Sequence, residues 1–210
     1  MSNQSIQFSQ EVNQVNTPYS LPMIQIPPSF RISHEQFVEL AGANRDIRLE
    51  RTAQGELIIM SPTYSDTGAS NAEIGGQLWY WNNKTKLGIV FDSSTGFHLP
   101  NGATRSPDAS WISLEQWNSL IPQQRQKFAS ICPDFVVELR SQSDSLVSVQ
   151  RKMHEFLENG LRLGWLIDKQ NRKVEIYQPG EEIKILNNPN ELSGGNILPG
   201  FILDLSRIWN

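Results

Sequence analysis

Three residues near the middle of the chain have types and spacing that could support metal-dependent phosphodiester chemistry: Asp108, Glu138 and Lys152. Asp108 follows a proline, and Glu138 interrupts an otherwise apolar run, residues 135–139, of the kind found in strands buried on both faces. A buried carboxylate costs several kcal/mol unless it is paired with a cation or ligates one. Two such acids on separate strands therefore indicate either a divalent-metal site or a structural ion pair.

Each residue also has a simpler interpretation. An aspartate after a proline often accepts backbone hydrogen bonds in a turn. Glu138 could pair with Arg140, which lies two positions further along the strand and therefore on the same face. On the helix expected at residues 144–159, Lys152 lies at the edge of the apolar stripe, from which it could reach the sheet or extend into solvent. The spacing permits a cluster but does not require one.

A metal at this place would have oxygen ligands. Asp108, Glu138 and the carbonyl oxygen of Leu139 are hard ligands of the kind that Mg²⁺ or Mn²⁺ prefers. A metal held there would make bound water more acidic and neutralise charge on a phosphate, and Lys152 would orient that water or stabilise the charge that develops on the phosphoryl group. Glu73, on an earlier helix, is a candidate ligand for a second metal, although an exposed helix glutamate is the simpler interpretation.

The order of the surrounding elements predicts an α/β fold in which a central mixed β-sheet lies between helices. A β-hairpin at 47–60 and a short helix with a Ser33–Gln36 capping box precede it. We expect longer helices at 68–86 and 144–159, helical turns at 114–130, and strands at 88–92, 96–99, 108–113, 133–139, 163–168 and 173–177. Residues 1–29 are rich in Gln, Asn, Ser and Pro, which predicts a flexible N-terminal arm before a domain at 30–210.

The composition and the distribution of apolar residues argue against several classes of protein. A net charge of −4 argues against a protein dedicated to coating nucleic acid. No apolar run approaches the roughly 18 residues of a membrane span, and the first residues lack the pattern of a signal peptide. The single cysteine, Cys132, excludes an intrachain disulfide and a cysteine-rich zinc site. We therefore expect a cytoplasmic protein with no membrane association.

Five stretches together resemble a known family in their order and spacing: residues 55–63, 105–111, 132–141, 164–168 and 198–201. They are similar to the Uma-type restriction endonucleases, a group common in cyanobacteria that belongs to the PD-(D/E)XK nuclease superfamily. The resemblance implies a restriction-endonuclease-like αβα core and cleavage of DNA that depends on Mg²⁺ or Mn²⁺. Because such nucleases often pair two sites to cut two strands, it also implies a homodimer.

The chain departs from the superfamily pattern at one position. The motif ends acid-x-lysine, whereas Arg140 occupies the lysine position here. Relatives of this type often carry the basic residue on the next helix instead, and Lys152 fits that arrangement. Arginine is a poor substitute where a compact or titratable cation is needed. The competing hypothesis is a catalytically inactive module with the same fold that binds nucleic acid or a protein partner.

Overall fold

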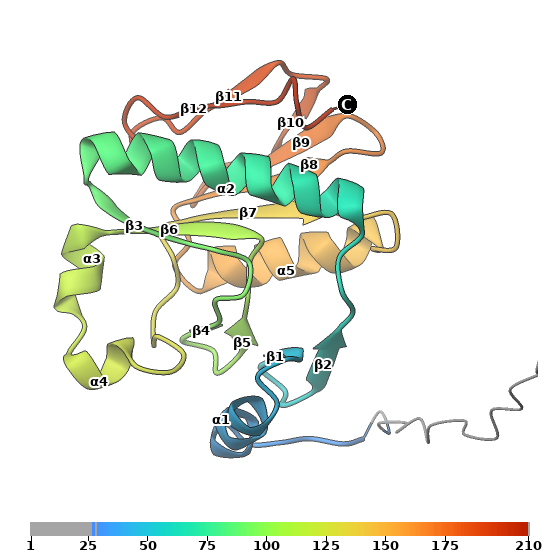
Figure 1. The fold of residues 1–210 in the computed structure, drawn as a ribbon, viewed down its shortest axis with the longest axis vertical. Helices are drawn as coiled ribbons and strands as arrows, with labels where there is room; N and C mark the ends of the chain where they lie inside the picture. Colours follow the sequence, from blue (N-terminus) through green and yellow to red (C-terminus); the bar gives the residue numbers. More distant parts are fainter. Residues whose placement is uncertain (1–26, 28, 210) are drawn as a thin grey trace, which may run out of the picture.

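A computed structural model describes residue 27 and residues 29–209 (Figure 1). The predicted N-terminal arm, residues 1–29, lies almost wholly outside the described residues, so the arm and the domain boundary after it remain predictions. The helices are α1 His34–Ala43, α2 Ser65–Thr85, α3 Leu114–Ser119, α4 Pro122–Arg125 and α5 Leu146–Glu158. The strands are β1 Arg48–Arg51, β2 Leu57–Met60, β3 Gly88–Phe91, β4 Phe97–His98, β5 Thr104–Arg105, β6 Ala109–Ser113, β7 Phe135–Arg140, β8 Leu163–Asp168, β9 Lys173–Tyr177, β10 Lys184–Asn187, β11 Glu191–Ser193 and β12 Ile202–Asp204.

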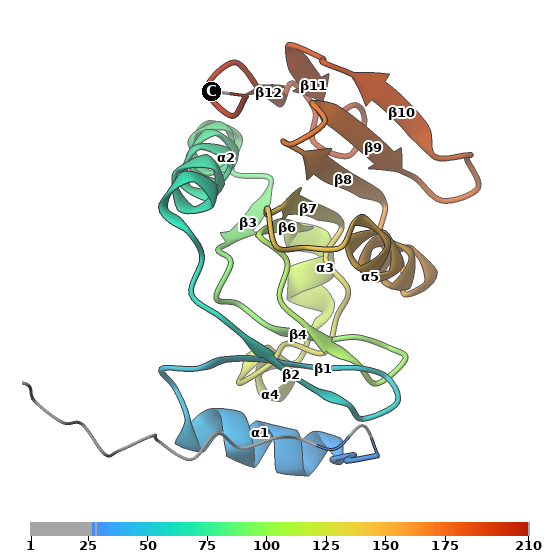
Figure 2. The same cartoon turned by 90° about the vertical axis from the view of Figure 1, so that its right-hand side faces the viewer.

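A six-stranded mixed sheet forms the centre of the fold, with the strand order β10-β9-β8-β7-β6-β3. Strands β7 and β8 are parallel and are joined through α5, and the other neighbours are antiparallel. Helix α2 covers one face of this sheet and α5 covers the other (Figure 2). The predicted α/β architecture, with a mixed sheet between helices, is therefore confirmed.

Strand β7 is buried on both faces, which explains its nearly unbroken apolar sequence. Phe135, Val137 and Leu139 share a core with the buried side of α2, whereas Val136 shares a second core with the buried side of α5. Because side chains alternate along a strand, Glu138 lies on the same face as Val136. The carboxylate of Glu138 is thereby directed toward α5, the helix that carries Lys152.

The predicted hairpin is confirmed, with Arg48 paired to Met60 and Arg51 paired to Leu57. Its turn passes through Gly55, whose φ of +86° favours glycine. The hairpin does not stand alone, however: β1 also pairs with β5, and β5 with β4, to give a second sheet of order β2-β1-β5-β4. Sequence reasoning did not predict this sheet, which lies between α1 and the central sheet (Figure 2).

The two long helices lie close to their predicted positions. Helix α2 begins at Ser65 rather than near residue 68, and it buries Ile74, Leu78 and Trp81, the apolar residues at helical spacing. The α1 capping box is present, since the Gln36 amide donates to Ser33 Oγ and the Ser33 amide donates to Gln36 Oε1. Within the described part of the chain, no helix combines the length and the apolar character needed to cross a membrane.

Candidate functional site

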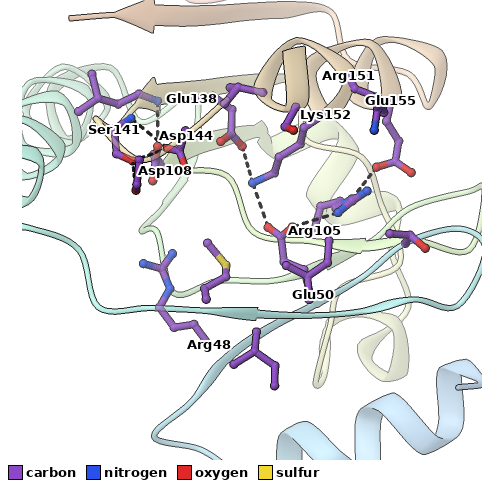
Figure 3. A pocket seen from close by; sticks show the side chains of 18 of the residues that line it. Arg48, Glu50, Arg105, Asp108, Glu138, Ser141, Asp144, Arg151, Lys152 and Glu155 are labelled. Atoms are coloured by element: carbon purple, nitrogen blue, oxygen red, sulfur yellow. Dashed lines mark hydrogen bonds and ion pairs between the residues drawn. The ribbon is translucent and has the colours of Figure 1, made fainter. Parts of the chain in front are cut away.

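A cavity of about 1120 Å³ lies between the hairpin strands β1 and β2, the loop after β2, and helix α5. Asp108, Glu138 and Lys152 all line it, although they come from the segment before β6, from β7 and from α5 (Figure 3). The fold thus brings three of the residues singled out in the sequence to the wall of one cavity.

The pairing of β6 with β7 brings Asp108 opposite Glu138. The antiparallel register pairs Ala109 with Val137, and one further step along it places Asp108 across from Glu138. Asp108 Oδ2 accepts a hydrogen bond from the Leu139 amide at 2.8 Å, and Oδ1 accepts one from the Asn71 side-chain amide at 3.2 Å. Burial raises the pKa of Asp108, while the charge of Lys152 and the bond from Leu139 oppose that rise.

Glu138 is only 6% exposed and carries a strongly perturbed carboxyl group. Burial raises the pKa of Glu138 to about 8, with Lys152 acting against the rise and the charge of Asp108 adding to it. Its Oε1 atom lies 2.8 Å from Lys152 Nζ, but this buried oxygen accepts no hydrogen bond of regular geometry among the described residues. The site therefore contains a costly buried acid, and its Oε1 atom is held by an ion pair with Lys152.

Lys152 reaches the site from α5 and is held by three oxygen atoms. Its Nζ lies 2.8 Å from Glu138 Oε1 and 2.9 Å from Glu50 Oε1, and it donates to the Ser106 carbonyl at 2.9 Å. Burial alone would lower the pKa of Lys152, but the carboxylates of Glu138 and Glu50 raise it above its ordinary value. The ammonium group is therefore charged and fixed in position at neutral pH.

Glu50 is a site residue that sequence reasoning missed. It lies on β1, is 3% exposed, and accepts from the Ser106 amide at 2.9 Å. Burial alone would raise the pKa of Glu50, but Lys152 and Arg105 lower it. Arg105 pairs with Glu50 at 3.1 Å and also with Glu155 of α5. A buried chain of alternating charges thus joins the hairpin sheet to α5 (Figure 3).

Arg140, at the motif lysine position, does not pair with Glu138. Its guanidinium lies 2.9 Å from Asp168 Oδ2, and Asp168 is its partner in the parallel register of β7 and β8. The hypothesis that Glu138 is buried because it pairs with Arg140 is therefore wrong. The cation beside Glu138 is Lys152, from the following helix.

The structure does not bring Glu73 to this cluster, so its assignment as a metal ligand needs correction. Glu73 Oε2 lies 3.2 Å from an Arg207 guanidinium nitrogen, and Oε1 accepts from Gln77 at 3.1 Å. Positions two apart on a helix point about 200° apart. Asn71 therefore faces Asp108, while Glu73 faces the C-terminal segment.

The remaining residues can be tested for their fit to a metal ion. The described residues hold no group of three or more His, Cys, Asp or Glu side chains suited to a metal. Mg²⁺ in proteins, however, often uses one or two carboxylates and completes its shell with water and substrate phosphate. The Leu139 amide points at Asp108, and the carbonyl of the same strand residue points to the same side. Asn71 Oδ1 is buried and unsatisfied, and Glu138 Oε1 has an ion pair with Lys152 but no hydrogen bond of regular geometry, so the donor set fits one Mg²⁺ or Mn²⁺.

Comparison with solved structures supports the description of the fold. The chain is similar to a crystal structure described as "a putative nuclease belonging to DUF820" from Anabaena variabilis, with a TM-score of 0.64 and 19% sequence identity. The match covers 77% of this chain and 89% of the other. At this identity the similarity establishes a shared fold, that of a protein described as a nuclease.

The family follows from the sequence match. The profile of the Uma2 family, described as "Putative restriction endonuclease", matches residues 34–206, and the chain belongs to this family. The resemblance inferred from the five sequence stretches is thereby confirmed. No curated protein matches the chain.

Proposed function

We propose that this protein is an endonuclease that hydrolyses phosphodiester bonds in DNA and depends on Mg²⁺ or Mn²⁺. Membership of the Uma2 family supports nuclease chemistry. The observation that carries the proposal is the meeting of Asp108 and Glu138 at the cavity wall, with Lys152 in contact with Glu138. Asp108, Glu138 and Lys152 are the proposed catalytic residues.

In this proposal Asp108, Glu138 and the Leu139 carbonyl hold the metal. When bound, the ion would supply Lewis-acid chemistry by neutralising phosphate charge and lowering the pKa of coordinated water. The surrounding residues hold the ligand carboxylates in position for the ion. The Leu139 amide and Asn71 fix the Asp108 carboxylate, and burial keeps Glu138 away from competing water. Deprotonated Glu138, costly when no metal is bound, is then stabilised by the cation.

Lys152 is proposed to act on the phosphate and on the attacking water. Its ammonium group is anchored by Glu50 and the Ser106 carbonyl, so it remains at the site if Glu138 turns to a metal. A preorganised cation next to the scissile phosphate stabilises the charge that develops in the transition state. Glu50 does not touch the reacting atoms and acts as a positioning residue for Lys152.

One observation favours a second candidate function, a nuclease fold that binds nucleic acid or a protein partner without cleaving. Lys152 Nζ has three oxygen atoms within 2.9 Å, and Arg140 is occupied by Asp168. If these contacts persist when nucleic acid binds, neither Lys152 nor Arg140 is left to act on the scissile phosphate. Cleavage assays separate this candidate from the endonuclease.

The test is cleavage of plasmid DNA, linear DNA and RNA by purified protein with Mg²⁺, Mn²⁺ or EDTA. We expect DNA to be nicked or cut with either metal and left intact in EDTA. Asp108→Asn should abolish cleavage, while Asp46→Asn, at an exposed position outside the cavity, should cleave like the wild type. Equal cleavage by wild type and Asp108→Asn would reveal a contaminating nuclease. DNA binding without cleavage in any metal would support the binding module.

Two further parts of the proposal rest on the sequence and the resemblance. We propose a cytoplasmic location and a homodimer, in which two sites would meet the two strands of a duplex. Light scattering coupled to size-exclusion chromatography tests the dimer directly. A mass near the 23.8 kDa of one chain at working concentrations would contradict it.

A further inference from the structure

Arg48, on β1, lies where two cavities meet. It lines the 1120 Å³ cavity that contains the proposed catalytic residues, and it also lines a second cavity of about 570 Å³ beside α2 and β3. The residues common to both cavities are Arg48, Thr63 and Asp108. Figure 3 shows the Arg48 side chain extending from β1 toward Asp108. The junction of the two cavities therefore coincides with one of the proposed metal ligands.

Arg48 differs from Lys152 and Arg105, the two cavity cations whose charges are matched by carboxylates. Lys152 and Arg105 each lie against two carboxylates. Within the part of the chain that the structure describes, Arg48 has no ion pair, and its guanidinium donates to the neutral carbonyl of Ser93. Its Nε is buried without a hydrogen-bond partner. A buried unsatisfied donor is costly, and an anionic ligand would offset that cost.

Arg48 also acts electrostatically on the acids around it. Burial raises the pKa of Asp108, and Arg48 is one of the charges that oppose the rise. Burial likewise acts to raise the pKa of Asp92, but hydrogen bonds from Ser94 and the charge of Arg48 leave it lowered. The guanidinium is thus close enough to influence Asp108, one of the proposed metal ligands, and within the described residues it forms no ion pair with that carboxylate.

The second cavity is open along one side of α2. Its wall includes small residues on one face of that helix, and Trp79, 58% exposed, lies further along. A Cβ placed at Gly68, Gly75 or Gly76 would meet nothing within 4 Å. A polynucleotide backbone could therefore approach this helix closely. The small wall residues are Gly68, Ala72, Gly75 and Gly76.

We propose that Arg48 binds a phosphate of the substrate strand next to the cleaved bond, and that the strand passes from the larger cavity, past Asp108, into the cavity beside α2. This inference rests on the proposed function, since it assigns a residue and a path for the same substrate. A guanidinium suits the role because its planar set of donors can bind two phosphate oxygens at once. The competing role is structural: Arg48 would only fasten the hairpin to the loop at Ser93.

The experiment measures oligonucleotide binding by fluorescence anisotropy in EDTA over a range of salt concentrations. Each phosphate contact contributes about 1 to the slope of log K against log salt. Arg48→Gln should lower that slope by about 1, and Arg48→Lys should keep the slope but bind more weakly. Arg45→Gln, at an exposed neighbouring position outside both cavities, is the matched control and should bind like the wild type. Arg48→Gln should still bind Mn²⁺ and should have a Tm close to that of the wild type.

The outcomes separate this inference from the proposed function. A wild-type slope in Arg48→Gln would overturn the phosphate contact, and a fall in Tm with that unchanged slope would identify a structural role. Should Arg48→Gln fail to fold, weaker binding at an unchanged slope or tenfold weaker cleavage in the folded Arg48→Lys variant would support the contact, and wild-type affinity and cleavage would reject it. If the wild type binds DNA without cleaving it, the endonuclease proposal fails. The salt dependence of binding by Arg48→Gln still tests whether Arg48 contacts a phosphate. An absence of binding at every salt concentration would overturn both.

Discussion

Lys152 Nζ lies 2.8 Å from Glu138 Oε1, so a lysine on α5 and a carboxylate on β7 form a buried ion pair. The contact exists because Glu138 occupies the face of β7 that packs toward α5, and because Lys152 borders the apolar stripe of that helix. Removing one partner of a buried pair leaves the other charge uncompensated. The pair should therefore influence stability, pH dependence and turnover together.

Lys152→Ala is expected to lower stability as well as turnover. It leaves Glu50, and Glu138 once it is deprotonated, without their shared cation, which we expect to destabilise the fold by about 3 kcal/mol, measured by urea unfolding. Arg151→Ala, at an exposed position on the same helix, should change the free energy of unfolding by no more than about 0.5 kcal/mol. Cleavage should fall far more than Mn²⁺ affinity. Equal losses of cleavage and of Mn²⁺ affinity would contradict the proposal that Lys152 acts on the attacking water and the phosphate.

The stability of the metal-free protein should fall with rising pH. Burial raises the pKa of Glu138 from 4.5 to about 8. Between these values the folded state binds a proton that the unfolded state has released, so stability is lost as the pH rises through about 8. Differential scanning calorimetry in EDTA should show Tm decreasing across this window, and Glu138→Gln should flatten the decrease. The lowered pKa of Glu50 acts below 4.5, outside the window.

Metal binding should reverse this pH dependence. Because the carboxylate of Glu138 must lose its proton to ligate a cation, Mn²⁺ should bind more tightly above pH 8 than at pH 6 and should release a proton at pH 6. Calorimetric titration in two buffers of different ionisation enthalpy measures the released proton. Glu138→Gln should remove the proton release and most of the affinity. Mn²⁺ affinity that does not change with pH would exclude Glu138 as a ligand.

Glu50→Gln tests the anchoring of Lys152. The change keeps the shape but removes the charge shared by Lys152 and Arg105, and it should destabilise the fold by about 1–3 kcal/mol. We expect kcat to fall while Mn²⁺ affinity stays within about twofold, because Glu50 is not a proposed ligand. Glu39→Gln, exposed on α1, serves as the control. Unchanged kcat in Glu50→Gln would show that Lys152 needs no anchor.

Local periodicity predicted much of the fold and part of the site. The apolar run around Glu138 indicated a strand buried on both faces, and the helical position of Lys152 directed it toward the sheet; both follow from the geometry of a single element. The same reasoning could have found Asn71, which lies three residues before buried Ile74 and so shares its helix face. Glu73 was proposed because of its charge, but its position two residues after Asn71 places it on another face of α2, where it contacts Arg207.

Glu50 could not be found in this way. In β1 it is one of several charged residues in a short hairpin strand, and its burial depends on β5 and α5 packing over one face. That packing is set by contacts between residues far apart in the chain. The second sheet escaped prediction for the same reason: a strand was predicted at 96–99, where β4 lies, but β5 has only two residues, too few to show a period, and its pairing with β1 joins distant segments.

The most direct test of the central claim is a crystal of the protein soaked with Mn²⁺ and measured for anomalous scattering. The account predicts one peak between the carboxylates of Asp108 and Glu138 and near the Leu139 carbonyl, with metal–oxygen distances of about 2.1 Å. In Asp108→Asn crystals the peak should weaken or disappear. A well-occupied peak elsewhere, or none between Asp108 and Glu138 at a saturating Mn²⁺ concentration, would contradict a metal-dependent nuclease site at this position.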